Sequence, residues 1–114
     1  MTLIYKILSK AEWRAAPAAG VFRGSAVDLN DGYIHFSSAA QAPETAAKHF
    51  SGRHDLMLFA VEAENLGSQL HWETSRGGER FPHLYAELPL SAVVWVRPLP
   101  LGADGRYDFG ILAP

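Results

Sequence analysis

A histidine lies between an aromatic residue and a hydroxyl-bearing residue in segment 33–37, which reads Tyr-Ile-His-Phe-Ser. Successive side chains of a β-strand point to opposite faces, so Ile34 and Phe36 share one face. The other face then carries three side chains that can hydrogen-bond or stack: Tyr33, His35 and Ser37. If the apolar face belongs to the core, the second face is available to a ligand.

Segment 81–85 repeats this arrangement with the sequence Phe-Pro-His-Leu-Tyr. Alternation places three of its side chains on one face: Phe81, His83 and Tyr85. Imidazole and hydroxyl groups can hydrogen-bond a ribose, and aromatic rings can stack on a flat ring, so the two segments predict a ligand cleft. The structural alternative is a histidine that only bonds a neighbouring carbonyl and a tyrosine that only caps the core.

Metal binding and nucleophilic catalysis are the other chemistries that these residue types could carry out. Imidazole and carboxylate ligands could come from four residues: His35, His71, His83 and Glu73. Their spacing matches no His-Glu-x-x-His pattern, so we expect separate histidines and no metal. Ser37 and Ser38 lack the Gly-x-Ser-x-Gly elbow of hydrolases, and Ser38 with Gln41 fits a helix cap better.

The polar segment 74–80 contains two adjacent glycines, which predicts a mobile loop that could act as a lid. Arg76 and Arg80 flank these glycines, and Arg23 is a further cation elsewhere in the chain. Each guanidinium could bind a phosphate or carboxylate through paired hydrogen bonds, although an exposed loop arginine is commonly only solvated.

Short strands and two or three short helices are expected to position these side chains. Strands are expected at 3–8, 20–25, 33–37, 56–61, 70–73, 81–85 and 92–97, with a weak one at 106–109. One helix is expected over about 10–17, capped by Ser9 and Glu12 and stopped by Pro17 and Gly20, and another begins at Pro43. Segment 56–61 is apolar on both faces, which predicts the central strand, whereas Pro82 predicts an edge or irregular strand.

The composition is that of one compact α+β domain spanning residues 1–114. The 114 residues are 48% hydrophobic and 19% charged, with no cysteine and a formal net charge of −2. These values exclude disulfides, thiolate metal sites and a cysteine nucleophile, and the absence of a basic stripe argues against a nucleic-acid partner. No apolar run approaches the roughly 20 residues that span a bilayer, so we expect no membrane partner and a cytoplasmic location.

Several motifs together resemble the bacterial and plant family called domain of unknown function 952. They are Asp31-Gly-Tyr-Ile-His-Phe-Ser37, Trp72-Glu73, the Phe-Pro-His-Leu-Tyr of 81–85 and Leu90-Ser-Ala-Val-Val94. The resemblance implies a compact relative of the ADP-ribosyltransferase fold. In that fold, two small, mostly antiparallel sheets form a cleft for NAD.

The resemblance also implies roles for individual residues, with NAD as the substrate. His35 would anchor the nicotinamide ribose, with Ser37 beside it. Tyr85 or His83, on a later strand, would stack on the nicotinamide ring. Nicotinamide would leave through an oxocarbenium-like transition state, which a carboxylate commonly stabilises. Segment 92–97 has no glutamate, so Glu73 is the preferred substitute.

Two other functions stay open from the sequence. The cleft could bind a nucleotide or another small ligand without turnover, which is consistent with the missing glutamate. Alternatively, the domain could bind a protein partner, or a second copy of itself, through an aromatic surface formed by Trp13, Trp72, Trp95 and Phe81.

Overall fold

The computed structural model describes residues 2–110, without the side chains of residues 17–19 and 76. Its largest sheet has the antiparallel order β1-β4-β8, formed by Leu3–Ser9, Leu56–Glu62 and Val93–Pro98. The apolar strand β4 is central, as its sequence predicts, and five of its seven residues are buried. Burial on both faces explains why β4 lacks the alternating pattern of a surface strand.

A second sheet, of order β3-β6-β5, is formed by Ile34–His35, Arg80–Leu84 and Leu70–Thr74. The expectation that Pro82 makes segment 81–85 an edge strand is wrong, because β6 lies between two partners. Strand β3 pairs only with residues 83 and 84, so the sheet tolerates a residue without an N–H at Pro82. The Pro82 carbonyl still accepts a hydrogen bond from the Phe36 amide.

A third sheet pairs β2 (Val21–Phe22) with β7 (Leu88–Pro89), so the domain has three small antiparallel sheets rather than two. Two strands are shorter than expected: segment 20–25 contains only the two-residue strand β2, and segment 33–37 contains only the two-residue strand β3. Segment 106–109 forms no strand; Tyr107 makes only an isolated bridge to Leu101. The α+β class predicted from the sequence is confirmed.

Helix α1 (Lys10–Ala19) begins at the capping box predicted from the sequence, in which the Ser9 and Glu12 side chains bond each other's backbone amides. The expectation that Pro17 stops this helix is wrong. A proline removes one N–H donor, and α1 tolerates the loss because Trp13 and Ala16 pack against the core. The chain leaves α1 at Gly20, which has a φ of 74°.

Helix α2 (Ala26–Asp31) is absent from the expected elements, because the sequence Asn30-Asp31-Gly32 is equally typical of a turn. Those residues form the helix end, where Gly32 adopts a φ of 87°. Helix α3 (Ala42–His49) begins near Pro43, as predicted. Three short 3₁₀ segments complete the chain: η1 (Ala63–Gln69), η2 (Arg76–Gly78) and η3 (Leu90–Ala92).

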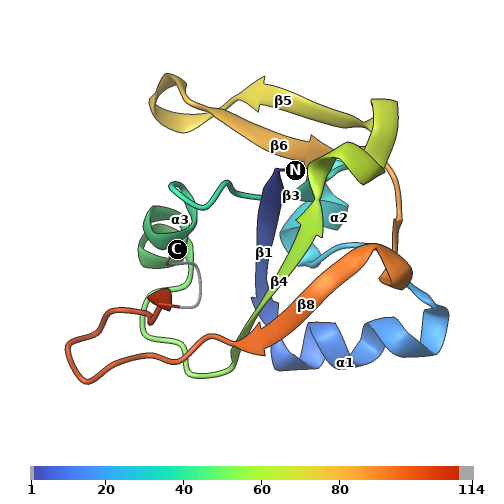
Figure 1. The fold of residues 1–114 in the computed structure, drawn as a ribbon. Coiled ribbons are helices and arrows are strands. Elements are labelled where there is room, and N and C mark those ends of the chain that lie inside the picture. Colours follow the sequence, from blue (N-terminus) through green and yellow to red (C-terminus); the bar gives the residue numbers. More distant parts are fainter. Residues whose placement is uncertain (1, 111–114) are drawn as a thin grey trace.

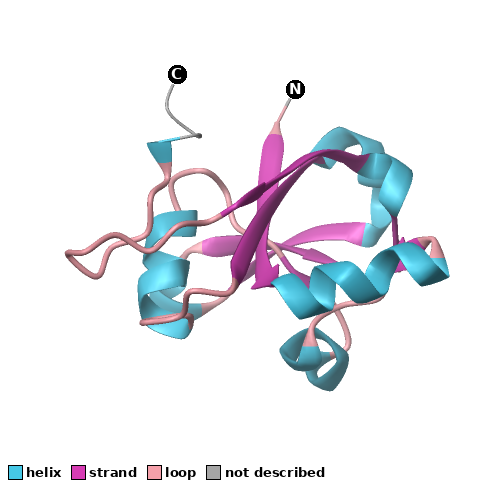
Figure 2. Cartoon of the chain, turned by 90° about the horizontal axis from the view of Figure 1, so that it is seen from below, coloured by secondary structure: helices cyan, strands magenta, loops and turns pink. Residues whose placement is uncertain are grey.

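The sheet β1-β4-β8 separates two apolar clusters, and the helices lie around the strands (Figures 1 and 2). Phe59 of β4 is fully buried in one cluster and contacts three aromatic rings: Trp13, Phe22 and Phe36. The two larger sheets are joined where Tyr5 of β1 and Ser37 exchange two backbone hydrogen bonds of 2.8 Å. This junction positions the candidate site.

Candidate functional site

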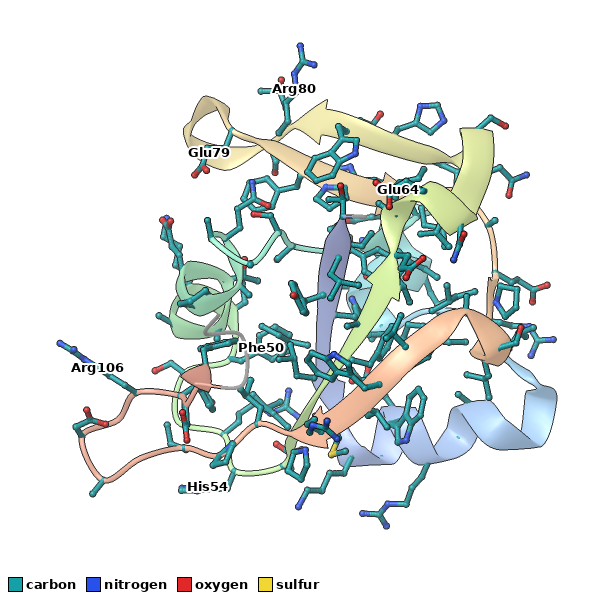
Figure 3. All side chains as sticks on the ribbon, in the orientation of Figure 1. Phe50, His54, Glu64, Glu79, Arg80 and Arg106 are labelled. Atoms are coloured by element: carbon teal, nitrogen blue, oxygen red, sulfur yellow. The ribbon has the colours of Figure 1, made fainter. Side chains whose placement is uncertain are left out.

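A cavity of about 350 Å³ lies beside the junction of the two larger sheets. Strand β1, helix α3 and strand β6 contribute to its walls, and Phe50 at the end of α3 projects toward β1 (Figure 3). The lining includes five residues predicted for the cleft: Tyr33, His35, Ser37, Phe81 and His83. A cavity of this size, with aromatic walls and few polar groups, is typical of small-molecule sites, which range over roughly 300–1,000 Å³.

The rings of segments 33–37 and 81–85 meet in one cluster at this cavity. The His35 and His83 ring centroids are 5.4 Å apart. Tyr33 contacts both rings, with centroid distances of 4.5 Å to His35 and 4.1 Å to His83. Strand alternation therefore predicted this cluster, because Ile34 and Leu84 occupy the opposite, buried face.

His35 is held between two carboxylates of helix α2. Its Nδ1 lies 2.6 Å from Asp28 Oδ1, and its Nε2 lies 3.0 Å from Asp31 Oδ2. Asp28 also accepts a hydrogen bond from the His35 backbone amide at 3.1 Å. The position and the ring orientation of His35 are thus fixed by α2, the helix that the sequence interpretation lacked.

Asp28 is itself bound by a buried lysine from the first strand. Lys6 Nζ lies 2.8 Å from Asp28 Oδ2, and the two side chains are 4% and 1% exposed. Burial opposes ionisation of Asp28, but the hydrogen bond to His35 and the charge of Lys6 outweigh it and hold the Asp28 pKa well below its usual range. Burial also lowers the Lys6 pKa, against the opposing effect of Asp28.

The second histidine has a carboxylate partner of its own. His83 Nδ1 lies 2.8 Å from Glu73 Oε1, and the same oxygen accepts a hydrogen bond of 2.7 Å from the Tyr85 hydroxyl. The hydrogen bond from Tyr85 lowers the pKa of Glu73 most, and the hydrogen bond to His83 lowers it further. Conversely, the Glu73 carboxylate raises the pKa of Tyr85 to about 12.

Ser37 has a structural partner as well as a place in the cavity wall. It is nearly buried, and its Oγ lies 3.1 Å from Thr45 Oγ1 of helix α3. The start of α3 carries the cap predicted from Ser38 and Gln41, and the Gln41 amide also donates to the Arg80 carbonyl at 2.7 Å. These bonds hold α3 against the two strand segments that line the cavity.

The remaining predicted residues lie outside the lining. Glu73 contacts the lining residue His83 by a hydrogen bond, and the Tyr85 ring packs against the lining residue Tyr33. Arg80 projects away from the molecule in Figure 3, Arg23 pairs with Glu87 on the surface, and the Arg76 side chain lies outside the described residues. Ser75 of the predicted loop does line the cavity.

Three residues that matter to the site were missed from the sequence: Lys6, Asp28 and Asp31. Asp31 enters the sequence analysis only as the first residue of a family motif, yet it lines the cavity. Lys6 was a detectable signal, because it is the only charged residue in the otherwise apolar strand Leu-Ile-Tyr-Lys-Ile-Leu of residues 3–8. A lysine on the same strand face as Ile4 and Leu8 requires a buried partner.

The described residues, 2–110, form neither a metal cluster nor a membrane-spanning helix. No group of three or more His, Asp or Glu side chains in this range is arranged to hold a metal ion. No described helix is both long and apolar enough to cross a membrane. Of the four aromatic residues expected to form a docking surface, Trp13 packs on Phe59 and Trp95 packs on Tyr5, against different apolar clusters.

Residues 7–96 match the family described as "Protein of unknown function (DUF952)". The chain belongs to this family. The DUF952 chain is also similar to protein CC0527 from Caulobacter crescentus. The crystal structure of CC0527 has 60% sequence identity and a TM-score of 0.94, covering 99% of this chain and 100% of that one. Its solution NMR structure has 61% identity and a TM-score of 0.86, covering 97% and 96% of the two chains.

No curated protein matches the sequence significantly. Neither the family description nor the similar structures name an ADP-ribosyltransferase, so that resemblance stays a prediction from the sequence. The family assignment made from the motifs is confirmed.

Tyr85 is expected to ionise near pH 12, later than the ordinary tyrosine value of about 10, because Glu73 favours its neutral form. A spectrophotometric titration at the phenolate absorbance of the four tyrosines measures this. Burial also raises the pKa of Tyr5 and of Tyr33, so the contribution of Tyr85 is the difference between the titrations of the unaltered chain and of Tyr85→Phe. Glu73→Gln should move this contribution to lower pH. A difference curve with its midpoint near the ordinary value of about 10 would contradict the effect of Glu73.

Proposed function

We propose that this DUF952 chain binds a small molecule composed of a flat ring and a hydroxyl-bearing sugar, and that the nicotinamide–ribose half of NAD is the best match. The cavity beside His35 and His83 is the observation that carries the proposal. Its aromatic side chains can stack on a pyridine ring, and polar lining residues such as Asp31 and Ser37 can hydrogen-bond ribose hydroxyls. The volume of about 350 Å³ suits one nucleoside-sized group.

The charge of the lining indicates which part of a dinucleotide would enter. Lys6 is the one lysine or arginine in the described lining, and Asp28 already neutralises it. Asp31 adds a negative charge at the cavity. A phosphate would therefore meet no available cation there, so we place the diphosphate of NAD outside the cavity and the nicotinamide ribose inside it.

An NAD-using transferase that releases nicotinamide is the activity implied by the family resemblance. A carboxylate near the ribose supports it, but this carboxylate is Asp31 and not Glu73, which lies outside the lining. A ligand-binding module without turnover is the second candidate. It is favoured by the involvement of Glu73 in hydrogen bonds to His83 and Tyr85, which leaves no free glutamate in the cavity.

Nicotinamide riboside at 100 times its dissociation constant is expected to stabilise the folded chain by about 2.7 kcal/mol, since a ligand of the folded state acts by mass action. A thermal-shift titration with nicotinamide riboside, NAD, ADP-ribose and nicotinamide measures the effect. His35→Gln and Phe81→Ala should weaken binding by tenfold or more. His54→Ala is the matched control, because His54 lies on the surface away from the cavity (Figure 3).

Stabilisation by ADP-ribose alone would contradict the placement of the nicotinamide ribose in the cavity. No stabilisation by any of the four compounds at millimolar concentration would contradict the proposed ligand class as a whole.

A further inference from the structure

Of the three histidines that line the cavity, the two that come from segments 33–37 and 81–85, His35 and His83, are held in different ways. Both ring nitrogens of His35 lie within 3.0 Å of a carboxylate oxygen, from Asp28 and Asp31. His83 has such a partner on Nδ1 only. Within the described part of the chain, no carboxylate lies within ion-pair distance of His83 Nε2. His83 is thus the histidine with a ring nitrogen left to exchange a proton.

The orientation of the His83 ring is set by its surroundings. Glu73, outside the cavity lining, binds the Nδ1 edge, so the Nε2 edge is the one left for a molecule in the cleft. Tyr33 packs against the ring, and Tyr85 fixes Glu73 through the shared oxygen. The His83 side chain is only 5% exposed, which limits its rotation and its contact with bulk water. A carboxylate that fixes the tautomer and stabilises the imidazolium is the arrangement of a general base.

We propose that His83, positioned by Glu73, is the general base for hydrolysis of an N-ribosyl pyridinium compound in this cavity; the proposal rests on the proposed function. The oxygen of a water molecule bonds to C1′ of the ribose, and the bond from C1′ to the pyridinium nitrogen breaks. The electron pair of that bond neutralises the ring as nicotinamide leaves. The water proton passes to His83 Nε2, and the imidazolium later releases it to solvent.

The other charged groups of the site fit complementary roles. C1′ gains positive charge as the leaving group departs, and the Asp31 carboxylate of the lining can stabilise it. His35, whose two nitrogens are already engaged by Asp28 and Asp31, has none left to take the water proton, and it instead positions the Asp31 carboxylate. The cavity therefore separates a positioning histidine from the proposed general base.

The test measures nicotinamide release and ligand affinity on the same samples with nicotinamide riboside as the probe. His83→Gln is expected to lower kcat by about 100-fold, the lower end for general-base catalysis, with Kd changed by less than about threefold. Glu73→Gln should lower kcat by roughly tenfold, again with little change in Kd. His54→Ala is the control for both quantities, and melting curves of every variant verify folding.

Rescue separates a catalytic from a structural role of His83. Free imidazole should restore part of the release by His83→Ala, because it can fill the space and accept the proton, whereas it should leave His35→Gln unchanged. Binding without release by the unaltered chain would overturn the catalytic proposal and leave the proposed ligand intact. So would equal losses of kcat in His83→Gln and His54→Ala. Failure of the unaltered chain to bind would instead overturn the proposed function.

Discussion

Asp28→Asn is expected to lower the free energy of unfolding by about 3–5 kcal/mol, because it leaves the buried Lys6 ammonium without a counter-ion. Lys6 is 4% exposed, so water cannot replace the lost carboxylate. An asparagine also offers one acceptor oxygen where Asp28 uses two, which bind Lys6, the Ser25 amide and His35. The free energy of unfolding of a single domain is usually only about 5–15 kcal/mol, so this loss is a large fraction of the total stability.

Urea unfolding of Asp28→Asn and of the double variant Lys6→Met, Asp28→Asn checks the cause. The double variant should be more stable than Asp28→Asn, since methionine removes the unpaired charge and retains the apolar stem of Lys6. Asp31→Asn is the matched control on the same helix; its partly exposed carboxylate should contribute less than about 1 kcal/mol. If Asp28→Asn and Asp31→Asn were equally stable, the buried pair would not be what stabilises the fold.

The same carboxylate connects folding with the site. Asp28 caps the start of α2 through the Ser25 amide and also binds the backbone and ring of His35. A variant at Asp28 that remains folded should therefore lose ligand affinity as well. The buried pair of Lys6 and Asp28 thus supports His35, while Lys6 also forms part of the cavity lining.

Features fixed by neighbouring residues could be predicted from the sequence. The Ser9–Glu12 and Ser38–Gln41 caps involve residues three apart, and both are present. The apolar faces of β4 and the alternation of segments 33–37 and 81–85 follow from the period of a strand. Alternation together with the family resemblance predicts that His35 and His83 face the same cleft, and the structure pairs the two residues.

Features that depend on distant partners could not be predicted in this way. Lys6 and Asp28 are 22 residues apart, and α2 has only six residues, too few for a clear periodic pattern. Pro82 shows the same difficulty, because its place in a central strand depends on β3 ending before it. Glu73 is expected from the sequence to supply the carboxylate of the cleft, but its side chain lies behind His83 rather than in the cavity.

Stability is expected to fall steeply in acid because of Asp28. Its pKa is lower in the folded chain than the value of about 3.9 in an unfolded chain, through its bonds to His35 and Lys6. Between these two values the unfolded chain binds more protons, so each step toward lower pH favours unfolding. The contribution of Asp28 is complete above about pH 5 and is lost as pH falls through 4 toward its folded-state pKa.

Urea unfolding at pH 6, 5, 4 and 3 measures this loss. The unaltered chain should lose more stability over the range than the double variant Lys6→Met, Asp28→Asn, which has no carboxyl at this position. Glu64, whose pKa is lowered to about 2 by hydrogen bonds from backbone amides, titrates in both chains and cancels in the comparison. Parallel curves for the two chains would mean that Asp28 ionises alike in the folded and unfolded states. In that case, ionised Asp28 would not be the group that holds His35 in place.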